Sequence, residues 1–318
     1  MLKIAILDDY AGVALALADW SEVEKRAEIT VFREAVAEGD IAEKLHRFDV
    51  ICTLRDRFPF TRVTFEKLPN LKALVASDPY VRVIDFAAAA ERGVEVLKGD
   101  APADMPVAGN STGEFAWGLL LATIRGIPSA AGHLRRGEWR QTLGMSLEGK
   151  TLGVVGLGRF GARMAEYGRV FDMNVLAWSQ NLSPEAAVRA GARLVDKETL
   201  FRESDIVTLH YVLSDRSRGL VGEKELNAMK PTAFLINTSR GPIVDEQALI
   251  AALKTKRIAG AGLDVFDQEP LPKEHPLLKL DNVVATPHLG FVTEPAMRRF
   301  YVGLAAQVTA YVENLQRQ

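Results

Sequence analysis

The stretch that most constrains the fold of this chain is residues 151–171, TLGVVGLGRFGARMAEYGRVF. An apolar run is followed by Gly156, Gly158 and Gly161 at the spacing G-x-G-x-x-G, and then by a helical pattern. This order predicts a strand, a tight turn and a helix. In dinucleotide-binding units the first glycine permits the turn, the second lets a pyrophosphate approach and the third lets the helix pack on the strand. The alternative, an ordinary glycine turn, does not require this flanking context.

Composition limits the class of protein and its partners. With 318 residues the chain is long enough for two domains, and its net charge of −2 argues against a nucleic-acid partner. Cys52 is the only cysteine, so no disulfide can form within the chain. The N-terminal sequence MLKIAILDD has too short an apolar stretch for a signal peptide, and the apolar segment 115–124 is too short to span a bilayer. We therefore predict a cytoplasmic protein that does not bind a membrane.

The first hundred residues read as a small α/β domain. Helical patterns at 13–26, 41–47 and 86–92 lie between short apolar runs. Strands that alternate with helices predict a parallel sheet with right-handed crossovers. The predicted strands are 4–7, 29–32, 50–54, 71–76 and 94–97.

The alternation of predicted strands and helices stops after residue 98 and restarts at residue 150. Between the two lie an irregular stretch, GDAPADMPVAGNST, and an apolar helix predicted over 112–127, with Ser111 or Thr112 as its cap. This helix is expected to be buried between domains or subunits, and it favours a homodimer. After residue 150, a helix over 184–190 is expected to begin behind a Ser183 cap. The predicted strands of the second sheet are 152–155, 174–178, 193–195, 206–209, 233–237, 260–265 and 283–286.

The predicted fold is therefore α/β with two doubly wound parallel-sheet domains. A flavodoxin-like substrate domain would comprise residues 1–100 and 291–318. A Rossmann cofactor domain would comprise residues 101–290, with 112–147 as helices between domains or subunits. If the final helix, 294–316, returns to the first domain, the cofactor domain is an insertion in the substrate domain.

Polar residues follow several strands of the second sheet, at the carboxyl edge where open parallel sheets bind ligands. Each alone has a structural alternative: a surface ion pair, a turn cap, a loop charge or a core histidine. Together they place an acid, a base and a guanidinium around a nicotinamide site. They are Thr238, Ser239 and Arg240 after one strand, Asp264 at the end of the next, Glu269 in its loop and His288 after the last.

The sequence resembles the D-isomer-specific 2-hydroxyacid dehydrogenases from about residue 150 to residue 290. The segments that carry the resemblance are GLGRFG, LHYVLSDRSRGLVG, MKPTAFLINTSRGPIVDEQALIAAL, IAGAGLDVFDQEP and NVVATPHLG. It implies hydride transfer between NAD or NADP and C2 of a 2-keto or 2-hydroxy acid, and a homodimer. It leaves open whether the acid is glyoxylate, hydroxypyruvate or a longer keto acid. No metal is implied.

The resemblance also implies roles for individual residues. His288 would be the acid/base, Glu269 its partner and Arg240 the anchor of the substrate carboxylate. The family's formate-oxidising branch has glutamine where Glu269 stands, which argues against that branch. The residues implied for the cofactor are Gly156, Gly158, Arg159, Phe160, Gly161, Ser179, Gln180, His210, Val212, Thr238, Ser239, Arg240, Asp264, His288 and Gly290.

Two segments depart from the family pattern. Members that prefer NAD have an acid after the second cofactor-domain strand, where this chain has Ser179 and Gln180, so we predict tolerance of both NAD and NADP. The loop expected to hold the substrate carboxylate reads Ser77-Asp78-Pro79-Tyr80-Val81, in which Asp78 would have to point away or pair with Arg82 or Arg55. The predicted substrate contacts are Arg55, Ser77, Asp78, Tyr80 and Arg240.

An alternative from another functional class is a dinucleotide-sensing corepressor on the same fold. Such relatives retain the catalytic residues but carry extended tails and peptide-docking surfaces. This chain ends soon after its last predicted helix, which makes that alternative less favoured.

Overall fold

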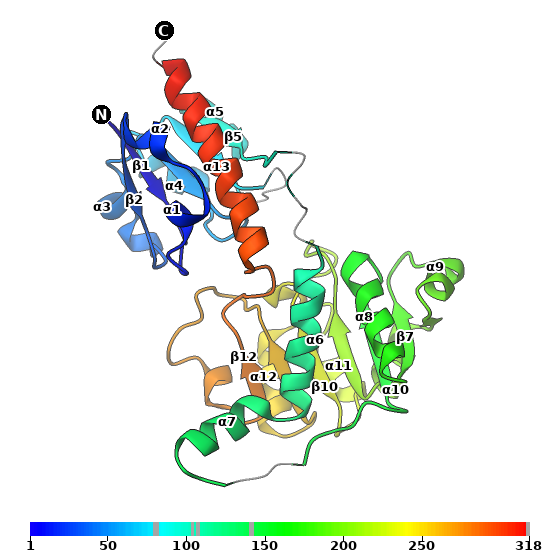
Figure 1. The fold of residues 1–318 in the computed structure, drawn as a ribbon. Helices are drawn as coiled ribbons and strands as arrows, with labels where there is room; N and C mark the ends of the chain where they lie inside the picture. The colour runs from blue at the N-terminus through cyan, green and yellow to red at the C-terminus, as the bar shows by residue number, and fades with distance from the viewer. Residues whose placement is uncertain (79–82, 103–104, 106–108, 140–142, 316–318) are drawn as a thin grey trace. The chain divides into compact units, whose positions relative to one another are not determined.

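The computed structural model describes residues 1–78, 83–102, 105, 109–139 and 143–315. The chain forms two compact units. Unit 1 consists of Met1–Gly109 together with Thr293–Gln318, and unit 2 consists of Asn110–Val292. The long last helix, α13 (Glu294–Leu315, red in Figure 1), thus belongs to the same unit as the N-terminus.

Within the described residues, unit 1 contains a five-stranded parallel sheet. Its order, β2-β1-β3-β4-β5, is that of flavodoxin-like domains. α13 packs against two short helices at the N-terminal end of the chain, α1 and α2 (Figure 1). The strands are β1 (Leu2–Ile6), β2 (Ala27–Val31), β3 (Val50–Thr53), β4 (Ala73–Ala76) and β5 (Glu95–Lys98), and the helices between them are α1 (Ala14–Leu17), α2 (Ser21–Glu24), η1 (Glu38–Asp40), α3 (Ile41–Leu45), α4 (Arg62–Glu66) and α5 (Phe86–Glu91).

The single helix predicted over 13–26 is wrong, because two short helices replace it. Ala18 has extended backbone between them, with φ −141° and ψ 157°. Trp20 is 3% exposed and its indole N–H donates to the Ala14 carbonyl over 3.0 Å. The Asp19 carboxylate accepts the Ser21 N–H and so favours a turn. Burial of the tryptophan in the core therefore outweighs the local helical pattern.

Within its described residues, unit 2 contains a seven-stranded parallel sheet in the order β12-β11-β10-β9-β6-β7-β8. The strand order reverses between β6 and β9, which creates the switch point at which doubly wound sheets bind dinucleotides. The predicted fold class is thus confirmed. The strands are β6 (Thr151–Val155), β7 (Asn174–Trp178), β8 (Arg193–Leu194), β9 (Ile206–Leu209), β10 (Phe234–Asn237), β11 (Gly260–Leu263) and β12 (Val283–Ala285).

Helices pack on both faces of this sheet. Successive strand residues point to opposite faces, so Ile206 joins the core under α6 and α8 while Val207 joins the core under α10, α11 and α12. Among the described helices, none is both long and apolar enough to cross a membrane. The helices are α6 (Ser111–Ile124), α7 (Ile127–Arg135), α8 (Arg159–Val170), α9 (Pro184–Arg189), α10 (Lys197–Glu203), η2 (Gly241–Ile243), α11 (Glu223–Ala228), α12 (Glu246–Lys254) and η3 (Pro276–Lys279).

The ends of two helices test the predicted caps. The Ser183 hydroxyl accepts the Ala186 N–H at the start of α9, as predicted. The cap predicted for the apolar helix is wrong, because α6 begins after Asn110 and has no side-chain cap. The Asn110 amide donates instead to the Tyr167 hydroxyl of α8 over 2.7 Å. Much of the apolar surface of α6 is buried inside unit 2, since Ala116 and Leu120 are fully buried.

Candidate active site

The glycine-rich turn between β6 and α8 has little room for side chains. Gly156 has φ +90°, a conformation that favours glycine. A Cβ on Gly161 would lie 1.9 Å from the Gly156 carbonyl oxygen, so only glycine lets α8 lie this close to the turn. A Cβ on Gly158 would meet no protein atom within 4 Å other than those of its chain neighbours. Gly158 immediately precedes the N-terminus of α8, so this open space suits a phosphate group.

His288 and Glu269 form a close pair. Nδ1 of His288 donates to Oε2 of Glu269 over 2.6 Å, and the Phe266 N–H donates to Oε1 over 2.9 Å. Burial raises the pKa of the Glu269 carboxyl, but these hydrogen bonds and the charges of His288 and Arg240 outweigh it and lower the pKa. Glu269 is therefore an anion near neutral pH. Its partner His288 has φ +53° and meets the Phe291 ring edge-to-face at 5.6 Å.

Arg240 lies in the loop after β10, and its backbone is held by that loop. The Asn237 amide donates to the Arg240 carbonyl over 3.0 Å, and Asn237 Oδ1 accepts the Ser239 N–H over 3.0 Å. The Arg240 guanidinium donates to the Ser239 carbonyl over 2.8 Å. Because its charge helps to lower the Glu269 pKa, the guanidinium belongs to the same electrostatic cluster as Glu269 and His288.

Asp264 organises the loop that carries His288. Its side chain is fully buried, and burial raises the pKa of the carboxyl despite its hydrogen bonds. Oδ1 accepts the Thr286 hydroxyl over 2.7 Å and the Leu289 N–H over 2.8 Å. Oδ2 accepts the Gly290 N–H over 2.8 Å. Three hydrogen bonds from residues on both sides of His288 thus converge on one carboxylate.

The remaining cofactor candidates lie around the carboxyl edge of the same sheet. Burial lowers the pKa of His210 to about 4, and its Nε2 lies 2.8 Å from the Thr208 hydroxyl. Val212 is 63% exposed. Thr238 is buried, and its hydroxyl has no hydrogen-bond partner among the described residues. The Phe160 ring, next to the glycine turn, carries the Arg159 guanidinium at 4.5 Å from its centroid.

The predicted substrate residues of unit 1 follow β3 and β4. Arg55 has φ +53°, its N–H donates to the Ser77 hydroxyl over 3.0 Å, and its guanidinium lies 5.9 Å from the Phe300 ring. Ser77 is buried and Asp78 is half-buried. Tyr80 and Arg82 lie outside the described residues. The structure therefore joins Arg55 to Ser77 and leaves the roles of the loop as predictions.

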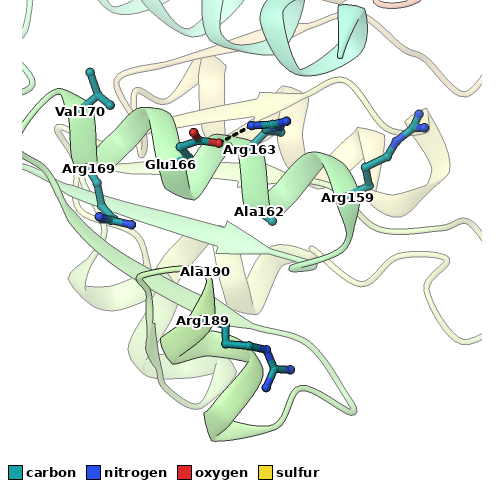
Figure 2. Close-up of a pocket in the computed structure, with 8 residues that line it drawn as sticks. All are labelled: Arg159, Ala162, Arg163, Glu166, Arg169, Val170, Arg189 and Ala190. Carbon is teal, nitrogen blue, oxygen red and sulfur yellow. Dashed lines mark hydrogen bonds and ion pairs between the residues drawn. The ribbon is translucent and has the colours of Figure 1, made fainter. Parts of the chain in front are cut away.

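A cavity of about 560 Å³ lies along α8 and α9 in unit 2 (Figure 2). Arginines dominate its lining, and one of them, Arg163, pairs with Glu166 over 2.6 Å. The lining does not include Arg240, Glu269 or His288, so this cavity is separate from their cluster. Its lining residues are Arg159, Ala162, Arg163, Glu166, Arg169, Val170, Arg189 and Ala190.

The chain is similar to known proteins over most of its length. Residues 117–290 match the family model for the NAD binding domain of D-isomer specific 2-hydroxyacid dehydrogenases. The chain belongs to this family. The glyoxylate reductase of Thermococcus litoralis is 39% identical over 303 residues, which cover 92% of this chain and 89% of that protein. The D-3-phosphoglycerate dehydrogenase of Methanocaldococcus jannaschii is 36% identical over 97% of this chain, which spans only 57% of that longer protein.

A solved structure agrees with this membership of the dehydrogenase family. The phosphoglycerate oxidoreductase from Vibrio cholerae O395 superposes with a TM-score of 0.88 at 34% identity, covering 99% of this chain and all of that one. The predicted class of activity, an NAD(P)-dependent oxidoreductase of 2-hydroxy acids, is therefore confirmed. The corepressor alternative finds no support among these relatives.

Sequence reasoning missed two side chains that hydrogen-bond to predicted site residues. Thr286 contributes its hydroxyl to the Asp264 carboxylate, and Tyr211 contacts both Ser179 and Gln180. Tyr211 stands between two predicted cofactor residues, His210 and Val212, and that position was the available signal. Its hydrogen bonds reach residues about 30 positions away, which no local pattern reports.

Proposed function

We propose that this dehydrogenase interconverts a 2-keto acid and its 2-hydroxy acid, with His288 as the acid/base. The observation that carries the proposal is the 2.6 Å hydrogen bond from His288 to an ionised Glu269, in the electrostatic cluster that includes Arg240. Such a set can bind an anionic substrate and move a proton at its oxygen.

Each side chain of the cluster has a separate task in the reduction. Because a carboxylate only accepts, Glu269 fixes the proton on Nδ1 of His288 and leaves Nε2 to serve the substrate oxygen. A protonated Nε2 gives its proton to the carbonyl oxygen as C2 is reduced, and in the reverse direction Nε2 takes it back. The Arg240 fork binds the substrate carboxylate and stabilises the charge that develops on the oxygen. Asp264 holds the loop that keeps His288 in place and would bind the nicotinamide amide.

The residues present fit a nicotinamide dinucleotide, which supplies or accepts the hydride at C2. The N-terminus of α8 and the open space at Gly158 would hold its phosphates. Ser179 and Gln180 would face the adenosine ribose, and since neither is acidic, both NAD and NADP would be accepted. A cytoplasmic location, where both dinucleotides are available, remains our prediction.

The substrate class is tested by dinucleotide oxidation against a panel of acids. We expect turnover of small 2-keto acids, because relatives include enzymes named glyoxylate reductase. The panel should run from glyoxylate and hydroxypyruvate to phenylpyruvate with NADH and NADPH. D-3-phosphoglycerate should be tested with NAD and NADP in the oxidative direction, because other relatives carry that name. Tight dinucleotide binding without turnover of any acid would contradict the proposal.

Replacing Glu269 by Gln is expected to remove the acid limb of the pH profile. The pKa of the Glu269 carboxyl is lowered, so the anion that holds His288 is lost only as the pH falls through that lowered value. In the unaltered protein, kcat/KM for the reduction should therefore fall at acid pH. The amide of Gln does not titrate, so E269Q should lack this fall and should have a kcat/KM at neutral pH that is lower by roughly tenfold or more. An acid limb that is unchanged in E269Q would show that Glu269 is not the titrating group.

We also propose that the protein is a homodimer. Apolar side chains of α7 and the segment after it are exposed, with Ile127 at 54%, Leu134 at 60% and Trp139 at 83%. An exposed apolar cluster of this kind favours association. Light scattering at micromolar concentration should give twice the chain mass, and Leu134→Glu should lower it. A monomer in the unaltered protein would refute the dimer.

A further inference from the structure

One aromatic side chain of unit 2, Tyr211, joins the loops that surround the switch point of the sheet. It follows β9, and its ring stacks on the Trp178 ring at the end of β7, with centroids 6.1 Å apart and planes at 16°. Its Cδ2 atom lies 3.1 Å from the position that a Cβ would occupy on Gly156. Its carbonyl accepts the Ser239 hydroxyl over 3.0 Å, in the loop next to Arg240. Tyr211, in the loop after β9, therefore contacts three other loops at this edge of the sheet, those after β6, β7 and β10.

The hydroxyl of Tyr211 occupies the end of β7, where a dinucleotide's adenosine ribose is read. The Gln180 N–H donates to it over 3.2 Å, and the Ser179 hydroxyl donates to it over 3.4 Å. Both distances are at the long end for hydrogen bonds, so these contacts are weak enough to exchange. The phenol oxygen thus accepts from the two donors of the segment that replaces the usual acid.

A 2′-phosphate and the phenol oxygen would compete for the same donors. A phosphate accepts hydrogen bonds only and gains from every N–H or O–H that points at it. The donors at Ser179 and Gln180 are already directed at an uncharged oxygen in this structure. Ribose hydroxyls, unlike a phosphate, can donate as well as accept, so they depend less on these two groups.

We infer that Tyr211 is a positioning residue that sets the preference between the two dinucleotides, by holding the Ser179 hydroxyl and the Gln180 N–H away from a 2′-phosphate. This inference rests on the proposed use of NAD and NADP by the same site. Its consequence is that the phenol hydroxyl disfavours NADP binding, while the ring and the backbone carbonyl of Tyr211 keep the loops in place.

The test is Tyr211→Phe, which removes the hydroxyl and keeps the ring. Dissociation constants for NADH and NADPH are measured by fluorescence titration, so that the test does not depend on turnover of a keto acid. Loss of the two weak competing hydrogen bonds should raise the affinity for NADPH relative to NADH by about fivefold. With an active substrate, the ratio of the KM for NADPH to the KM for NADH should fall in the same direction.

Tyr167→Phe is the matched control in the same unit. The Tyr167 hydroxyl accepts from Asn110 over 2.7 Å, on the face of the sheet covered by α6, and within the described residues it makes no hydrogen bond with Ser179 or Gln180. This variant also loses one phenol hydroxyl, and its ratio of the two dissociation constants should equal that of the unaltered protein. An unchanged ratio in Y211F, or an equal change in Y167F, would overturn the inference. Failure of all keto acids with dinucleotide binding intact would overturn only the proposed substrate.

Discussion

Replacing His288 by Asn should lower kcat for keto-acid reduction by about two to four orders of magnitude, the usual range for a positioned acid/base. Dinucleotide affinity should change little, because the phosphates are expected at the glycine turn and not at this loop. Asparagine is the better substitution, since position 288 has φ +53° and Asn tolerates that region whereas Ala would be strained. The amide can still accept or donate a hydrogen bond but cannot act as an acid/base near neutral pH.

The experiment compares kcat with the dissociation constant for NADH in the same preparation. His275→Asn is the control, because Nε2 of His275 pairs with Glu246 over 3.2 Å in the same unit, outside the proposed cluster. That variant should keep its kcat. If H288N retained activity within tenfold, or if H275N lost as much, His288 would not be the acid/base.

The fold could be predicted from the sequence because the two parallel sheets are built from short apolar runs between turn residues. Every predicted strand overlaps an observed one, for example 174–178 with β7. The pattern failed at 13–26, where burial of Trp20 splits the helix. That burial depends on the packed core of unit 1, which helical periodicity alone does not describe.

The Arg240, Glu269 and His288 cluster could be predicted for a different reason. Parallel strands end at one edge of a sheet, so polar residues after β10, β11 and β12 must gather there. Individual hydrogen bonds could not be predicted in the same way. Tyr211 reaches Gln180 across 31 positions, and the Asp264 carboxylate reaches Gly290 across 26, and both depend on where the loops turn.

The second large effect is expected in the glycine turn. Substitution of Gly161 should lower stability, whereas substitution of Gly158 should not. Gly161→Ala places a Cβ 1.9 Å from a backbone carbonyl oxygen, so α8 must move away from β6. We expect a loss of about 3 kcal/mol in stability and a fall of roughly 10 °C in Tm. The added Cβ in Gly158→Ala meets no protein atom within 4 Å beyond its chain neighbours, so the Tm of this variant should stay close to that of the unaltered protein.

Dinucleotide binding should separate the two glycines in the opposite way to thermal stability. Gly158→Ala should weaken dinucleotide binding by roughly tenfold at unchanged Tm, because its methyl group occupies the space proposed for the pyrophosphate. Thermal unfolding by circular dichroism and NADH titration on each variant separate the two effects. Gly118→Ala on the exposed side of α6 is the control, and it should raise stability by about 0.5–1 kcal/mol. If G158A bound NADH normally, the phosphates would not lie at this turn. If G161A kept its Tm, the close packing of α8 would not stabilise the unit.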